Sequence, residues 1–128
     1  MKYLVGADNN TWRLPDAINA AADGDTIEFQ AGYSPVVDGI VISKSLHFEG
    51  KVTMGENGNQ TFTNVITGRF NINQQANVTF ENIWICYGVE KTNIINCKEQ
   101  AEVSMTNCVL ESTQVDGEVY PVLYVENN

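Results

Sequence analysis

Three segments of this 128-residue chain share one pattern of apolar residues. They are KSLHFEGKVTM (44–54), ANVTFENIWIC (76–86) and AEVSMTNCVLE (101–111), so the first spacing is 32 residues and the second is 25. A repeat of this length, built from short strands without a helical period, is typical of a solenoid. In a solenoid each strand lies parallel to the equivalent strand of the next turn, about 4.8 Å away. The sequence therefore predicts stacked coils.

Aligning the three segments places similar residues in columns. The apolar columns are Leu46/Val78/Val103, Phe48/Phe80/Met105 and Val52/Trp84/Val109. Another column holds Gly50, Asn82 and Asn107. A tight bend between strands needs a positive φ, which Gly adopts freely and Asn adopts more readily than other residues. Stacked Asn side chains can also bond to each other in a ladder. We interpret these three residues as a structural turn ladder.

A second short strand is predicted before each repeat. These strands are GIVIS (39–43), GRFNIN (68–73) and TNIINC (92–97), and PVLYVENN (121–128) has the pattern of a fourth. The chain thus accounts for about four coils. Because it stops within a strand pattern, we expect either an open end that associates with another chain or a natural protein that continues past Asn128.

One helix is predicted, at about residues 14–22. Leu14, Ile18 and Ala21 form an apolar stripe, and Pro15 is tolerated in the first turn. Gly24 is the expected left-handed stop. We therefore expect a single domain over 1–128, with an N-terminal cap at 1–25 and solenoid coils at 26–128.

The segment LPDAINAAADGDTIEFQAGYSPVVDGIVISKSLHFEG (14–50) resembles the N-terminal cap and first coil of right-handed parallel β-helix proteins, the pectin-lyase-like superfamily. This resemblance implies an all-β fold whose capping α-helix closes the bottom of the coil. It implies much less about activity, because the superfamily includes lyases, hydrolases, esterases, adhesins and non-catalytic scaffolds.

The same resemblance shows which catalytic patterns to seek. Pectate-lyase-like sites hold Ca²⁺ with several carboxylates on one face, and we expect no column of Asp or Glu on successive turns here. The acidic motifs of polygalacturonase-like hydrolases are missing. His47 alternates with apolar neighbours and is expected to face solvent. The sequence therefore predicts no catalytic residue, no metal site and no cofactor; if the chain is an enzyme, a polysaccharide lyase or glycoside hydrolase is expected.

Three aromatic residues are candidates for binding. If Ile83 and Ile85 point inward, the strand pleat turns Trp84 outward, and Tyr87 and Tyr124 could extend that surface. Three interpretations remain open for Trp84: cover by the loop at 55–62, a protein interface, or a platform for a glycan.

Charge and cysteine content limit partners and compartment. With 7 basic and 16 acidic residues the net charge is -9, which argues against nucleic acid. No window has the roughly 20 apolar residues of a membrane span. Three cysteines (Cys86, Cys97 and Cys108) are expected to be buried free thiols, and MKYLVG is no signal peptide. We expect a cytoplasmic protein, or a secreted or surface one if the chain is an excised fragment.

These observations predict a non-catalytic β-helix scaffold or protein-interaction module that associates through an open solenoid end. The alternative is a carbohydrate-binding or polysaccharide-degrading protein with an incomplete site. The expected partner is a protein or a second copy, and a polysaccharide is possible.

Overall fold

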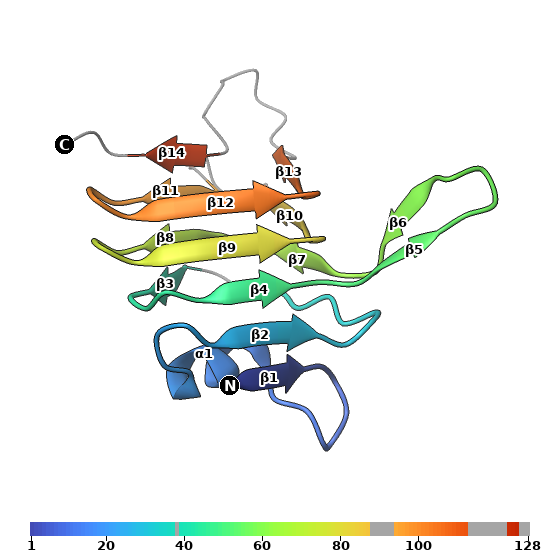
Figure 1. The fold of residues 1–128 in the computed structure, drawn as a ribbon, viewed down its shortest axis with the longest axis horizontal. Helices are drawn as coiled ribbons and strands as arrows, with labels where there is room; N and C mark the ends of the chain where they lie inside the picture. Colours follow the sequence, from blue (N-terminus) through green and yellow to red (C-terminus); the bar gives the residue numbers. More distant parts are fainter. Residues whose placement is uncertain (38, 88–93, 113–122, 126–128) are drawn as a thin grey trace.

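The computed structural model describes residues 1–37, 39–87, 94–112 and 123–125, and these form stacked layers of short strands (Figure 1). The largest sheet, sheet A, is parallel and has the strand order β1-β2-β4-β9-β12. Its strands are β1 (Lys2–Val5), β2 (Thr26–Phe29), β4 (His47–Glu49), β9 (Asn77–Glu81) and β12 (Glu102–Thr106).

Two smaller parallel sheets and one hairpin complete the strands. Sheet B contains β7 (Val65–Thr67), β10 (Trp84–Tyr87) and β13 (Val109–Ser112). Sheet C contains β3 (Ile40–Ile42), β8 (Phe70–Ile72), β11 (Ile95–Cys97) and β14 (Leu123–Val125). The hairpin pairs β5 (Val52–Met54) with β6 (Gln60–Phe62) and extends away from the stacked layers (Figure 1).

From β7 onward the chain visits the sheets in a fixed order, B then C then A, and repeats this order up to β14. Each strand pairs in parallel with the strand that occupies the same place in the next layer. The inward side chains of the three sheets meet in one hydrophobic core. The structure is thus mostly β, and its sheets are parallel apart from the hairpin.

The pairing register agrees with the aromatic column of the sequence alignment. Phe48 lies opposite Phe80, and Phe80 lies opposite Met105. The rings of Phe48 and Phe80 are stacked, with centroids 5.0 Å apart and an angle of 13° between their planes. Phe70 from sheet C meets the Phe80 ring edge-on at 5.5 Å. Each layer of the core thus packs directly on the next.

The predicted alignment of Val52 with Trp84 is wrong. Trp84 pairs with Val65 and Val109, whereas Val52 belongs to the antiparallel hairpin. The hairpin is an insertion that leaves the layer at Lys51 and returns at Thr63, whose backbone N–H donates to the Lys51 carbonyl at 3.1 Å. This insertion accounts for the longer first spacing between the repeats.

The N-terminal region differs from the prediction in three respects. The helix α1 (Leu14–Ala20) is shorter than the expected 14–22. It ends at Ala21, which is extended, and Gly24 has its positive φ of 89° in the turn before β2 instead. The region expected to be only a cap also contains β1, which pairs in parallel with β2. The segment KYLV places three apolar residues in a row, so it lacks the alternation that marks a half-buried strand.

Replacing Phe80 by Ala is expected to lower the free energy of unfolding by about 3–5 kcal/mol, because a fully buried ring between two other rings would leave a cavity. Urea denaturation measures this change. Thr79→Ala, at the neighbouring outward position, is the matched control and should change the free energy by less than about 0.5 kcal/mol. Equal losses in the two variants would contradict this description of the core.

Candidate functional site

The Asn column forms the bend between sheets A and B. Asn82 and Asn107 have positive φ angles of 61° and 52°. The side-chain amide of Asn107 donates to Asn82 Oδ1 at 2.8 Å and to Gln60 Oε1 at 2.6 Å. These residues therefore join two layers and the hairpin. A similar pair, Gln75 and Gln100 with φ of 68° and 66°, was not anticipated from the sequence.

Gly50 does not share the positive φ expected for this column. A Cβ at this position would overlap the backbone oxygen of Asn82 and lie 2.8 Å from Ile83 Cγ1. The position therefore requires Gly because the backbone of the next layer approaches it closely.

Gly50→Ala is expected to lower the free energy of unfolding by about 1–3 kcal/mol, because the new methyl group has no space. Gly55→Ala is a matched control, since its Cβ would make only an ordinary contact, 3.5 Å from the Asn59 oxygen. Thermal denaturation of both variants measures the difference. If Gly50→Ala is as stable as Gly55→Ala, the close approach does not constrain the fold.

Trp84 lies on the outward face of sheet B and is half-buried. Ile83 and Ile85 on either side of it are fully buried. The ring of Phe62, the last residue of β6, meets the Trp84 ring edge-on with centroids 5.9 Å apart. The hairpin thus covers part of Trp84, as the interpretation of cover by the segment 55–62 expected, and less of the indole is available as a platform.

The other two candidate aromatic residues belong to different sheets. Tyr87 ends β10 in sheet B, and Tyr124 lies in β14 of sheet C, paired with Asn96. Their side chains lie outside the described part of the structure. The backbone positions do not place Tyr124 on the same sheet as Trp84.

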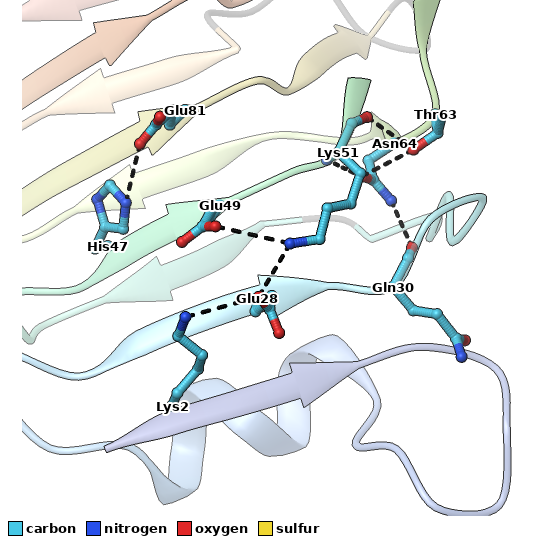
Figure 2. A network of polar contacts seen from close by, with 9 residues as sticks. All are labelled: Lys2, Glu28, Gln30, His47, Glu49, Lys51, Thr63, Asn64 and Glu81. Atoms are coloured by element: carbon cyan, nitrogen blue, oxygen red, sulfur yellow. Dashed lines mark hydrogen bonds and ion pairs between the residues drawn. The ribbon is translucent and has the colours of Figure 1, made fainter. Parts of the chain in front are cut away.

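The outward face of sheet A carries a column of acidic residues, which the sequence analysis expected to be absent. Glu28 pairs with Glu49, and Glu49 pairs with Glu81, on three consecutive strands (Figure 2). The aligned segments already place Glu49 over Glu81, but the third segment has Thr106 there and Glu28 precedes the first, so the column was not recognised. Carboxylates on adjacent parallel strands are about 4.8 Å apart at the backbone, so they need cationic partners.

Each of these carboxylates has a basic neighbour (Figure 2). Lys51 Nζ lies 3.0 Å from Glu28 Oε2 and 3.7 Å from Glu49 Oε1. Lys2 Nζ lies 3.7 Å from Glu28 Oε2. His47, expected to face solvent, is half-exposed and its Nε2 lies 3.3 Å from Glu81 Oε2. The hydrogen bond from Lys51 is the main reason that the pKa of Glu28 is lowered.

Asn64 holds Lys51 in place below this face. It is a fully buried polar residue, and its Oδ1 accepts the backbone N–H of Lys51 at 2.7 Å. Its amide nitrogen donates to the carbonyls of Gln30 and Tyr33, both at 2.9 Å. Asn64 thereby ties the end of the hairpin to the turn after β2 (Figure 2).

The described residues offer few other groups that could bind a metal or act as a nucleophile. Among the described residues, no group of three or more His, Cys, Asp or Glu could hold a metal ion, and no helix is long and apolar enough to cross a membrane. All three cysteines are free; Cys97 is buried, whereas Cys86 and Cys108 are half-buried, so complete burial was wrong for these two. Burial raises the pKa of the Cys108 thiol, which disfavours a reactive thiolate.

No protein-family model, curated protein or solved structure matches this chain.

Glu28→Gln is expected to lower the free energy of unfolding at pH 7 by about 0.5–1 kcal/mol, since the site is near the surface. The pKa of Glu28 is lowered in the folded chain, so its contribution is present above the unfolded value of 4.5 and is lost as the pH falls through the folded value. The difference from the parent should therefore disappear at acidic pH. Urea denaturation from pH 7 to pH 3 measures it.

Glu56→Gln is the matched control for this titration. Glu56 is exposed on the hairpin and makes no ion pair within the described residues. A deficit in Glu28→Gln that persists unchanged at pH 3 would show that the ion pairs are not its cause.

Proposed function

We propose that this chain is a right-handed parallel β-helix of the pectin-lyase-like kind, and that it acts as a non-catalytic scaffold that binds protein through its β12 end. The cyclic order of the strands and their parallel, in-register pairing support the β-helix. The right hand is the one that nearly all parallel crossover connections adopt. Free cysteines favour a reducing compartment such as the cytoplasm.

The N-terminal end of the stack is covered. Helix α1 buries Leu14, Ala17 and Ile18 against the core. The outer edge of β1 is also occupied, because Trp12 N–H donates to the Leu4 carbonyl and the Trp12 carbonyl accepts from Gly6, both at 2.9 Å. The helix therefore covers the core at this end, and Trp12 pairs with the last part of the β1 edge, although Leu4 and Trp12 remain partly exposed.

The proposed binding surface is at the opposite end of sheet A, which ends at β12. Among the described strands β12 pairs only with β9, so its other edge has no partner there. Its inward residues Val103 and Met105 are partly exposed, whereas Val78 and Phe80 in the layer below are 1% and 0% exposed. A five-residue edge beside apolar side chains is a template for an added strand.

A second candidate function is polysaccharide cleavage at the acidic column. It is favoured by Glu28 and Glu49 on adjacent strands with Lys51 between them. Glycosidases use such carboxylate pairs as acid and base or nucleophile. We prefer the scaffold because Lys51 Nζ, 3.0 Å from Glu28 Oε2, favours the charged carboxylate, whereas a general acid must carry a proton.

The scaffold is tested by strand addition at β12. A peptide of residues 76–82, the sequence that pairs with the other edge of β12, should protect the β12 amides from hydrogen exchange, or the chain alone should exceed 14.2 kDa in solution. Val103→Lys with Met105→Lys should abolish either effect, since two ammonium groups would have to be buried. Thr79→Lys, on the outward face of β9, is the matched control and should leave it intact.

Two outcomes oppose this proposal. A chain that remains monomeric at every concentration and gives the β12 amides no protection with the peptide would contradict binding at this edge. Release of reducing or unsaturated sugars from polygalacturonate, lost in Glu49→Gln, would instead support the second candidate.

A further inference from the structure

The loop between β1 and α1 borders an open hollow of about 600 Å³, which neither the scaffold nor the acidic column uses. Its lining includes Asp8, Asn9, Asn10, Trp12 and Asp16. This volume lies within the range of small-molecule sites. The lining combines one large aromatic ring with a hydroxyl group, amides, two carboxylates and the Arg13 guanidinium, so the hollow is polar with a single apolar wall.

Trp12 supplies that wall, and it is held firmly although it is 43% exposed. Its ring meets the buried Tyr3 edge-on, with centroids 5.3 Å apart and an angle of 76°. Its backbone N–H and carbonyl are both bonded to the β1 segment. An exposed indole fixed in this way can stack with a ligand without losing further conformational freedom.

The loop around Trp12 is also held in place before any ligand arrives. The Arg13 guanidinium donates to the carbonyls of Gly6, Ala7 and Asp8. The Thr11 hydroxyl donates to the Asp8 carbonyl at 2.8 Å. Arg13 is thus engaged with the backbone and is a poor receptor for an anion.

Several polar side chains of the hollow are left with bonding capacity. Within the described residues, the side chains of Asn9, Asn10 and Asp16 make no hydrogen bond. Asp8 Oδ2 accepts from the Gln30 amide at 2.6 Å, and its second oxygen has no such partner in the part of the chain that the structure describes. Amides both donate and accept, and carboxylates accept.

We propose that this hollow binds a neutral saccharide, with the apolar face of a sugar ring on Trp12 and its hydroxyl groups bonded by Asn9, Asn10 and Asp16. The two carboxylates disfavour an anionic ligand, and the polar lining disfavours an apolar one. A hydroxylated ring matches the mixture of donors and acceptors beside an aromatic face. This site is independent of the proposed β12 interface, so either can fail without the other.

The experiment follows the two indole N–H signals by NMR in ¹⁵N-labelled full-length chain, with Trp84→Phe used to assign them. The probes are three neutral tetrasaccharides (cellotetraose, maltotetraose and xylotetraose), tetragalacturonate as the anion, and tetramethylammonium as the cation. We expect at least one neutral tetrasaccharide to shift the Trp12 signal with millimolar affinity. Binding should be retained in Trp84→Phe.

Variants of the lining test whether the binding is specific to the hollow. Trp12→Ala should weaken binding at least tenfold, as followed by backbone amide shifts of residues 8–16. Because Trp12 contacts Tyr3, Asn10→Ala is the second variant: its exposed side chain supports nothing in the fold, and its loss should weaken binding about threefold or more. No shift with any neutral probe, stronger binding of tetramethylammonium or tetragalacturonate, or unchanged affinity in both variants would overturn the proposal.

Discussion

Parallel strand pairing in register places each side chain beside its counterpart one layer away, about 4.8 Å apart. Most features of this structure depend on that constraint. It brings Phe48 onto Phe80 in the core and joins Asn82 to Asn107 at the bend. The same spacing forces Glu28, Glu49 and Glu81 into one column on the surface. In a layered fold, similar residues on successive strands become neighbours. Like charges therefore need groups of opposite charge beside them, whereas aromatic rings can pack on one another.

Lys51 and Asn64 together reduce the repulsion between the carboxylates that the layering stacks at the first repeat. Lys51 lies between two stacked carboxylates and offsets part of their repulsion, and its backbone is fixed by the buried amide of Asn64. Asn64 also bonds two carbonyls of the turn after β2. Burying an amide is costly unless its hydrogen bonds are satisfied, and here both ends of the side chain are used. One residue thereby links the surface ion pairs, the hairpin and the layer below.

Features that recur in several layers could be predicted from the sequence, whereas features that occur once could not. The register of Phe48, Phe80 and Met105 followed from the spacing, because a buried column selects apolar residues in every layer. Val52 was misplaced because an apolar residue at the right distance from Gly50 fits a hairpin strand equally well. Gly50 itself was assigned to the correct column for the wrong reason, since close approach and positive φ both select Gly. Of the candidate site, Trp84 was expected to face outward, and its cover by the segment 55–62 was one of the interpretations, which the contact with Phe62 supports. The exposure of Trp12 depends on a loop whose path no local pattern encodes.

The hairpin has a further consequence for how this architecture can vary. It departs and returns at adjacent backbone positions, Lys51 and Thr63, and it touches the layers through Gln60 and Phe62, near its return. Closing a longer excursion at the same two points costs little additional entropy, roughly 0.6 kcal/mol for each doubling of its length. Segments of other lengths and sequences could therefore occupy this place while the layers keep their register. The core is thus constrained residue by residue, whereas an insertion at this hairpin could give the surface new contacts while the core keeps its packing.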